Sequence, residues 1–274
     1  MTDASSDHSP AISVITINRN MAEALTRTIA SVSCQDALSR EYIVVDGAST
    51  DGSVEVIVRH SNVVDRWVSE PDRGIYDAMN KGVILARGDW VLFLNSGDVL
   101  AAPDTLSAIL AAAEAGDDIL YGKALVRYAS GATHVANALA PEELPFGMIC
   151  SHQALLARRA LLVEMPFRIG KIRSDYEFLL RCRAGGRRFH RTGILIAISE
   201  AGGLSDRRRF SVLRETVSLL HRYGLVEPRT ILYLARSFLW ASLCACVKPL
   251  MPVSMIDAAR RCKLAVFGVR SARW

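Results

Sequence analysis

One stretch decides the fold: Trp67 to Leu100 reads WVSEPDRGIYDAMNKGVILARGDWVLFLNSGDVL. A short apolar run ends at a polar segment, and a second apolar run, after a helical segment, stops at another. The helical segment has apolar residues at Ile75, Met79, Val83 and Ala86. Strand, helix and strand in this order form a parallel crossover unit, and the carboxyl ends of its strands form the ligand crevice of an open α/β sheet. We therefore expect Glu70, Asp72 and Asp98 to face one cleft.

Two further strands are predicted before this unit. The continuous apolar run from Ala11 to Ile17 is typical of a strand buried on both faces of a sheet. Tyr42 to Val45 predicts a second strand, which ends at Asp46. The turn that follows is dense in Gly, Ser and Asp. Two interpretations stay open: a loop with an N-cap at Ser49 or Asp51, or a ligand contact in which Asp46 accepts hydrogen bonds from the edge of a nucleobase.

Composition limits the classes of protein that this cleft can belong to. The chain has 274 residues, half of them apolar, which is enough for a large core. Residues 1–10 are polar and lack the apolar segment of a secretory signal, so we expect a disordered N-terminus and a cytosolic protein. The six cysteines form no CxxC pair, which favours reduced thiols. Motifs of dinucleotide-binding proteins, P-loop proteins, zinc proteases and serine hydrolases are missing from the sequence.

Four motifs follow one another along the chain: VITINRN from Val14, VVDGASTDGS from Val44, SEPDRGIYDAMNKG from Ser69 and ARGDWVLFLNSGD from Ala86. Their order and spacing resemble the family 2 glycosyltransferases of the GT-A fold, which use nucleotide-diphosphate sugars. The resemblance covers roughly residues 11 to 205 and is closest to bacterial enzymes that assemble exopolysaccharide, capsule or lipopolysaccharide. It implies an α/β domain with a Rossmann-like, mixed but mostly parallel sheet flanked by helices.

The resemblance also assigns the donor side of the site. It places Thr16 and Asn18 beside the nucleotide and Asp46 at the base, and Asp98 helps to hold a divalent metal, Mn²⁺ or Mg²⁺, against the diphosphate. Many relatives read Asp-x-Asp-Asp where this chain reads Asn95-Ser96-Gly97-Asp98, so two carboxylates are missing. Both metals prefer oxygen ligands and often keep waters, so one carboxylate, the diphosphate and waters can suffice. Asn95 is expected to bind the nucleotide sugar.

Four more residues are candidates for the site. Glu70 and Asp72 either cap the helix predicted at 73–86 or accept hydrogen bonds from hydroxyls of the sugar or the ribose. His152 lies in a segment that the resembled family places near the acceptor and the metal, which implies an acceptor-side role. Asp175 falls in the first turn of a predicted helix, where an N-cap would explain it. In the resembled family an Asp at this place is the general base that deprotonates the acceptor hydroxyl in an inverting transfer.

The tail, residues 206–274, carries the positive charge. It has thirteen Lys and Arg against four Asp and Glu, which is +9 and leaves −4 for residues 1–205. Basic amphipathic helices are predicted at Asp206–Tyr223 and Met255–Val269. The longest charge-free piece, Ser237 to Val247, has eleven residues, well short of the roughly 20 that span a bilayer. The tail either docks on anionic lipid or packs on the catalytic domain and a second subunit. Nucleic-acid binding is not expected, because no recognised module is present.

The sequence therefore predicts an inverting glycosyltransferase. Its expected donor is a nucleotide-diphosphate sugar, first of all a UDP-sugar, and its expected acceptor is a glycan or a polyprenyl-diphosphate-linked sugar at the inner face of the bacterial cytoplasmic membrane. Two alternatives stay open: a sugar nucleotidyltransferase, although its Gly-rich N-terminal signature is missing, and a non-catalytic protein that binds sugar nucleotides.

Overall fold

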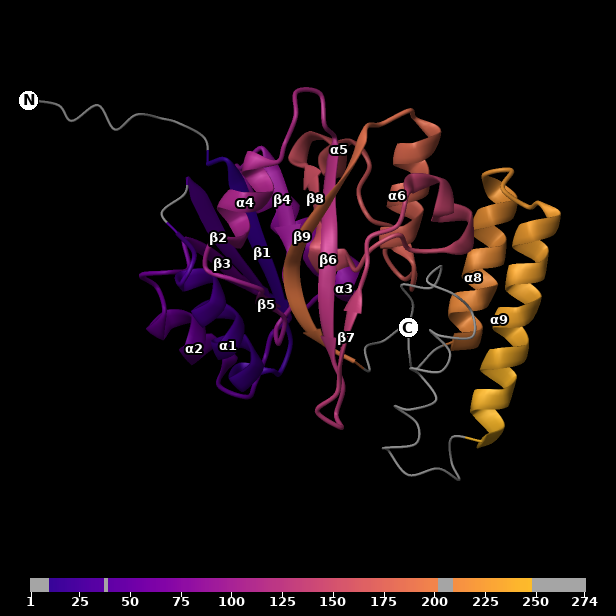
Figure 1. The fold of residues 1–274 in the computed structure, drawn as a ribbon. Coiled ribbons are helices and arrows are strands. Elements are labelled where there is room, and N and C mark those ends of the chain that lie inside the picture. The colour runs from indigo at the N-terminus through magenta and orange to yellow at the C-terminus, as the bar shows by residue number, and fades with distance from the viewer. Residues whose placement is uncertain (1–9, 37–38, 202–208, 248–274) are drawn as a thin grey trace, which may run out of the picture.

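The computed structural model describes residues 10–36, 39–201 and 209–247 (Figure 1). A mixed sheet runs through the molecule with the strand order β3-β2-β1-β4-β8-β6-β9-β5, and β7 pairs with β6. Strands β3, β2, β1 and β4 are parallel, whereas β8 runs antiparallel to both β4 and β6. The strands are β1 (Ile12–Asn18), β2 (Arg40–Asp46), β3 (Arg66–Ser69), β4 (Trp90–Phe93), β5 (Val99–Leu100), β6 (Ile119–Arg127), β7 (Thr133–Ala136), β8 (Leu155–Arg158) and β9 (Phe189–Glu200).

Helices cover both faces of the sheet. Two separate apolar clusters result, one under α1, α2 and α4 and the other under α3, α5 and α6. These helices are α1 (Ala22–Ser33), α2 (Ser53–Arg59), α3 (Ile75–Leu85), α4 (Thr105–Ala111), α5 (Arg159–Glu164) and α6 (Ser174–Ala184). Two short 3-10 helices, η1 (Pro141–Phe146) and η2 (His152–Ala154), lie between β7 and β8 in the chain. The prediction of an α/β fold with a mixed sheet flanked by helices is confirmed.

Strand β1 explains why the core has two halves. All seven of its residues are buried, because β2 and β4 flank it and helices cover both of its faces. Successive side chains of a strand point to opposite faces, so Ile15 and Ile17 enter the cluster under α3, while Ile12 and Val14 enter the cluster under α1. The prediction of a strand buried on both sides is confirmed.

Helix α3 lies within the predicted range 73–86, but its buried face differs at one position. Ile75 is 39% exposed, and Tyr76 is buried in its place with Met79 and Val83. The prediction that Ile75 belongs to the apolar face is therefore wrong. Positions 76, 79 and 83 keep the helical spacing, and the aromatic ring of Tyr76 packs 5.5 Å from that of Phe167 in the core.

The described part of the tail consists of α8 (Arg209–Arg222) and α9 (Pro228–Val247), which lie side by side beyond α6 (Figure 1). The rings of Tyr233 on α9 and Phe146 on η1 are 5.7 Å apart, which joins this hairpin to the sheet domain. Within the described ranges no helix is long and apolar enough to cross a bilayer. The helix predicted at Met255–Val269 and the predicted disorder of residues 1–9 lie outside the described residues.

Candidate active site

The register of the sheet brings three polar residues together. Asn18 at the end of β1 pairs with Asp46 at the end of β2, and Asp46 pairs with Ser69 at the end of β3. The parallel strands therefore end in one row of polar side chains. Such a row at the carboxyl ends of parallel strands is where α/β sheets bind ligands.

Asp46 is the centre of this row and has no exposed surface. Its carboxylate accepts hydrogen bonds from Asn18 Nδ2 at 2.7 Å, from Ser69 Oγ at 2.7 Å, and from both the backbone N (2.9 Å) and Oγ (2.5 Å) of Ser49. Burial alone would raise the pKa of Asp46, but the hydrogen bonds from Ser49, Ser69 and Asn18 together lower it below its usual value. Asp46 is thus an ionised group that ties three strands together. A nucleobase could reach its carboxylate only by displacing one of these hydrogen-bond donors.

Thr16 is also wholly buried. Its hydroxyl lies 2.7 Å from the carbonyl of Leu94 and 2.9 Å from the hydroxyl of Tyr42. Thr16, which was predicted to lie beside the nucleotide, is therefore two residues before the polar row, and its side chain points into the core. Asn18, two residues further along β1, is the residue of this pair that reaches the row.

Glu70 and Asp72 follow β3, at the same edge of the sheet. Glu70 is exposed and forms an ion pair with Lys81 at 2.8 Å. Asp72 is half-buried, and its Oδ1 accepts a hydrogen bond from the backbone N of Gly74 at 2.8 Å, just ahead of α3. Its Oδ2 lies against Gly47, where a Cβ would come within 2.4 Å of it. The missing side chain at Gly47 is what lets the Asp72 carboxylate lie over the end of β2.

The turn from Asn95 to Asp98 connects the row to the other half of the site. Ser96 Oγ donates to Asn18 Oδ1 at 2.8 Å, and Asn95 Nδ2 lies 2.8 Å from Nε2 of His152 on η2. Gly97 has a φ of 99°, which favours glycine. Thr28 of α1 accepts from the backbone N of Gly97 and donates to the carbonyl of Asp98, so helix α1 holds the turn in place.

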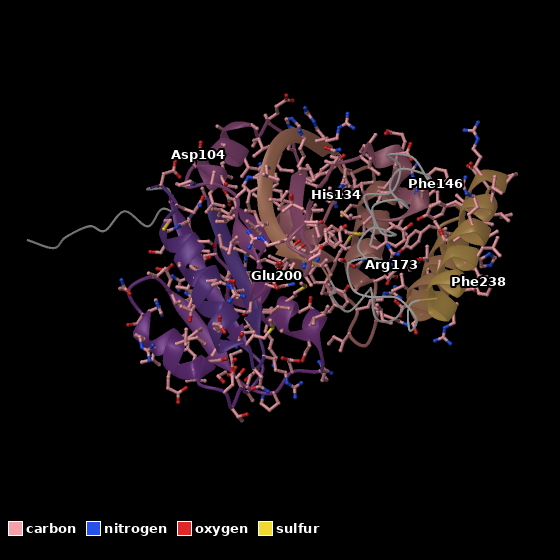
Figure 2. All side chains as sticks on the ribbon, turned by 60° about the horizontal axis from the view of Figure 1, so that its bottom comes forward. Asp104, His134, Phe146, Arg173, Glu200 and Phe238 are labelled. Atoms are coloured by element: carbon pink, nitrogen blue, oxygen red, sulfur yellow. The ribbon has the colours of Figure 1, made fainter. Side chains whose placement is uncertain are left out.

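Asp98 is 7% exposed, and burial raises its pKa to about 7. A hydrogen bond from Gln153 lowers the pKa in part, and the charge of Glu200 raises it further. Glu200 lies nearby because Val99 pairs with Ile198 across the β5–β9 ladder, and Figure 2 shows it at the end of β9. Asn95 Oδ1 is buried, and no described residue donates to it. Two carboxylates and an orphaned amide oxygen fit a divalent cation, which prefers oxygen ligands.

Asp175 is the second residue of α6, and it is half-buried. It is not the N-cap, which is Arg173; its Oδ1 accepts hydrogen bonds from the hydroxyl of Tyr76 and from the backbone N of Tyr176, both at 2.8 Å. His152 and Asp175 line one cavity, so the η2 segment and the start of α6 face each other. Contacts thus run from Asp46 through Asn18 and the Asn95 turn to His152, opposite Asp175.

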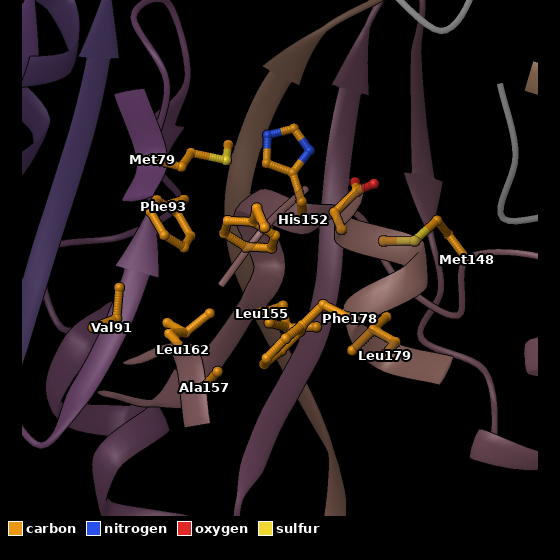
Figure 3. Close-up of a pocket in the computed structure, with 12 residues that line it drawn as sticks. Met79, Val91, Phe93, Met148, His152, Leu155, Ala157, Leu162, Phe178 and Leu179 are labelled. Carbon is orange, nitrogen blue, oxygen red and sulfur yellow. The ribbon is translucent and has the colours of Figure 1, made fainter. Parts of the chain in front are cut away.

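The cavity beneath His152 and Asp175 is otherwise lined by apolar side chains. Figure 3 shows the His152 ring at one end of it, above Phe93, Leu155 and Leu162. Its volume is about 20 Å³, room for about one water, so it forms an apolar floor under the site and not a sugar pocket. Burial against this floor lowers the pKa of His152, although the Asp175 carboxylate opposes the shift. The imidazole is therefore neutral near pH 7.

Helix α8 of the tail packs directly on the segment that leads to Asp175. Glu215 Oε2 accepts hydrogen bonds from the backbone N atoms of Ile172 (2.9 Å) and Arg173 (3.0 Å). Arg222 forms an ion pair at 2.8 Å with Glu177, whose side chain is almost wholly buried in α6. Of the two explanations for the tail, packing on the catalytic domain therefore describes α8.

A second group of ionisable residues lies elsewhere. Ligand atoms of Glu114, Asp117 and His190 lie within 4.8 Å of one another. The cluster is at the amino ends of β6 and β9, the edge of the sheet opposite the polar row. The guanidinium of Arg188 forms ion pairs with both Glu114 and Asp117, at 2.5 and 3.1 Å. Arg188 already occupies the space beside both carboxylates and offsets part of their charge, so the Asn95–Asp98 turn is the better place for a metal.

The architecture is the GT-A fold. A Staphylococcus aureus TarS structure (residues 1–349, in complex with UDP-GlcNAc) superposes with a TM-score of 0.63 at 18% identity, covering 83% of this chain and 71% of TarS. The mannosyltransferase PcManGT from Pyrobaculum calidifontis, in complex with GDP-Man and Mn²⁺, gives 0.63 at 17% identity, covering 94% and 81% of the two chains.

Sequence comparison assigns the family within this fold. The model described as Glycosyl transferase family 2 matches residues 13–170. A PGL/p-HBAD biosynthesis glycosyltransferase of Mycobacterium tuberculosis (strain ATCC 25177 / H37Ra) is 32% identical over 206 residues, which cover 72% of this chain and 80% of that protein. The chain belongs to glycosyl transferase family 2 and is a glycosyltransferase enzyme.

Sequence reasoning missed several residues that organise the site. Ser49, considered only as an N-cap, and Ser69 hold Asp46. Tyr76 donates to Asp175, and Glu215 holds the loop before α6. Tyr76 carried a usable signal, because a tyrosine at a core spacing of a helix buries a hydroxyl that needs a partner. Glu215 carried none, since its partners are backbone N–H groups more than forty residues away.

Proposed function

We propose that the enzyme transfers a sugar, with inversion, from a nucleotide-diphosphate sugar to a hydroxyl of a glycan or a polyprenyl-diphosphate-linked acceptor. The donor would lie over the polar row, with Asn18, Glu70, Asp72 and Asn95 around the nucleotide sugar and its diphosphate beside Asp98. Asp46 and Thr16 support this edge from below. The observation that carries the proposal is the run of contacts from Asp46 to His152, which ends opposite a single carboxylate, Asp175.

In this proposal Asp175 is the general base. The acceptor hydroxyl gives its proton to the Asp175 carboxylate, its oxygen forms a bond to the anomeric carbon, and the bond from that carbon to the diphosphate oxygen breaks. The nucleoside diphosphate leaves with the bonding electron pair. His152 stands between the two halves of the site, where its neutral imidazole can hydrogen-bond the acceptor without adding a charge.

A divalent metal, Mn²⁺ or Mg²⁺, would be held by Asp98 with Asn95 Oδ1 and Glu200 as further oxygen ligands. When bound, it supplies positive charge to the leaving diphosphate. The Mn²⁺ in the PcManGT complex supports this choice of cofactor. Asp98 would bind it as the carboxylate, which its buried position otherwise disfavours.

The donor is tested with a panel of UDP-, GDP- and dTDP-sugars, each with Mn²⁺, by measuring release of the nucleoside diphosphate. We expect slow hydrolysis of one UDP-sugar without an acceptor, and none in EDTA. Exchange of pyrophosphate into the nucleotide sugar would instead reveal a nucleotidyltransferase. Binding of a nucleotide sugar without turnover under any condition would favour a non-catalytic protein.

The base is tested with Asp175→Asn. Transfer should fall about 10²- to 10⁴-fold, the usual effect of losing a general base, while donor binding measured by calorimetry stays within about twofold. Asp104→Asn is the matched control, because Asp104 also lies at the start of a helix, α4, but is exposed and away from the polar row. Transfer by Asp175→Asn at more than a tenth of the wild-type rate would remove Asp175 from this role.

We also propose that the α8–α9 hairpin binds the anionic inner face of the cytoplasmic membrane, where a polyprenyl-linked acceptor would reside. Supporting this are exposed large apolar side chains on the two helices, interleaved with arginines. The apolar ones are Phe210, Val217, Ile231, Leu232, Phe238 and Leu239.

Sedimentation with vesicles of phosphatidylglycerol and phosphatidylcholine tests the membrane surface. The double variant Leu232→Ser with Phe238→Ser should bind at least tenfold more weakly than the wild type. Ile84→Ser on α3 is the control, since Ile84 is also apolar and even more exposed but lies on the sheet domain. Equal binding by all three proteins, or no binding by the wild type, contradicts the proposal.

A further inference from the structure

The carboxylate of Asp175 is held from one side only. Oδ1 accepts two hydrogen bonds, from the Tyr76 hydroxyl and the backbone N of Tyr176. Across the described residues, no hydrogen bond is donated to Oδ2. One oxygen is therefore anchored and the other is left to take up a proton.

The Tyr76 hydroxyl has a single proton and two acceptors within reach. Oδ1 of Asp175 lies 2.8 Å from it and the carbonyl oxygen of Ile172 lies 2.9 Å from it. When Asp175 is ionised, both oxygens can accept a hydrogen bond, so the single O–H of Tyr76 is shared between them or donates to one of them. The O–H then donates to the Asp175 carboxylate, because a hydrogen bond to a carboxylate is about twice as strong as one to a neutral carbonyl.

We propose that Tyr76 is the positioning residue of the catalytic base: it donates to Oδ1 while Asp175 is ionised and turns its proton to the Ile172 carbonyl once Oδ2 has taken the acceptor's proton. This inference rests on the proposed function of Asp175. The bonds that change are those of the transfer itself. The O–H bond of the acceptor breaks and its proton ends on Oδ2 of Asp175, while the anomeric carbon exchanges its bond to the diphosphate oxygen for a bond to the acceptor oxygen. Tyr76 keeps its own proton throughout.

Several features suit Tyr76 to this role. It is buried on α3, and burial together with the neighbouring carboxylate raises the pKa of its hydroxyl well above the usual value, so it stays a donor at every working pH. The Ile172 carbonyl is fixed as well, because Glu215 of α8 holds the backbone N atoms of Ile172 and Arg173. The second acceptor thus keeps its place while the first changes charge.

Besides Tyr76, the charged and titratable groups around Asp175 come from two places, the segment at η2 and the head of α6. His152 and Cys150 face it from the segment at η2, and burial keeps both neutral near pH 7 by lowering the pKa of the imidazole and raising that of the thiol. Arg173 lies at the head of α6 itself, with its guanidinium stacked 4.3 Å from the centre of the Tyr176 ring and 3.1 Å from Thr216 of α8. Tyr76 is the one described side chain that hydrogen-bonds the carboxylate.

The test is the pH profile of transfer by Tyr76→Phe. Without the hydrogen bond from Tyr76 to the ionised carboxylate, the acidic limb of the pH profile of kcat/KM should move to higher pH by about half a unit to one unit. Binding of the nucleotide sugar should be unchanged. Tyr121→Phe is the matched control. Tyr121 is buried and donates its hydroxyl to the backbone carbonyl of Leu139 at 2.9 Å, and no carboxylate of the described residues accepts a hydrogen bond from it. The acidic limb of the Tyr121→Phe enzyme should therefore not move.

A second substitution keeps the test valid if Tyr76→Phe folds poorly. Site-specific Tyr76→3-fluorotyrosine leaves the shape almost unchanged and makes the hydroxyl a stronger donor, so the acidic limb should move in the opposite direction, to lower pH. An unmoved limb in both proteins, with Asp175→Asn inactive, overturns the role of Tyr76 and leaves the proposed function standing. An active Asp175→Asn enzyme instead overturns the proposed function.

Discussion

Asp98→Asn should make the metal-free protein more stable at pH 8. Burial, with the charge of Glu200, raises the pKa of Asp98 from 3.8 to about 7. At about 1.4 kcal/mol per unit, ionising this group inside the fold costs about 4 kcal/mol relative to the unfolded chain. Because the folded pKa lies above the unfolded one, stability is lost as pH rises between about 4 and 7. An amide carries no charge, and its oxygen can still accept the hydrogen bond from Gln153.

Urea denaturation in EDTA at pH 5 and pH 8 measures this effect. We expect the variant to be more stable than the wild type by about 2–4 kcal/mol at pH 8 and by no more than about 1.5 kcal/mol at pH 5. Asp104→Asn, at an exposed position, should differ from the wild type at neither pH. A variant that is less stable at pH 8, or a difference that does not shrink at pH 5, would refute the reasoning.

Two other substitutions test the donor edge. Asp46→Asn should lower the free energy of unfolding by about 2–4 kcal/mol at pH 7, because an NH₂ group then faces donors such as Asn18 and Ser69. The pKa of Asp46 is lowered in the fold, so the carboxylate stabilises the protein above about pH 4 and this stabilisation disappears as the pH falls below that. Urea denaturation of both proteins should therefore show a smaller difference in unfolding free energy at pH 3 than at pH 7. Gly47→Ala should raise the KM for the nucleotide sugar about tenfold with kcat nearly unchanged, since the new Cβ displaces the Asp72 carboxylate. Steady-state kinetics measures this, and Gly193→Ala, where a Cβ meets nothing within 4 Å, is the control. An equal KM in both variants would remove Asp72 from donor binding.

The parallel half of the sheet could be predicted because its signals are local. β1 and β4 are mostly apolar runs that end at polar turns, so both their position and the side of the ligand crevice follow from the sequence. The same reasoning placed α3 to within two residues at either end. What it could not place is the two-residue strand β5, which exists only because β9, a hundred residues later, pairs with it.

For the candidate site, the sequence indicates which residue types follow the strands but not which contacts they make. The sequence indicates that Asp46 is a strand-terminal carboxylate, but its four hydrogen bonds come from Asn18 on β1, from Ser69 on β3 and from Ser49 in the following turn, and the two from other strands could not be predicted from spacing. The resemblance singles out Asp175, but it gives no sign of the partner Tyr76, which lies 99 positions away in sequence. Pairings of this kind are set by how α3 and α6 pack on one face of the sheet, which is a property of the whole core.

The contact between α8 and the head of α6 bears on where this enzyme can be cut. The region that the family model recognises stops at residue 170, short of Asp175 and of everything in the tail. A protein trimmed just before residue 209 would keep Asp175 but lose Glu215, which would expose two backbone N–H groups that no other described residue bonds. Among the described residues, Glu177 would then keep Arg168 as its one ionic partner. The α8–α9 hairpin is therefore not a separate appendage but part of the packing around Asp175, and domain boundaries drawn for expression belong after α9.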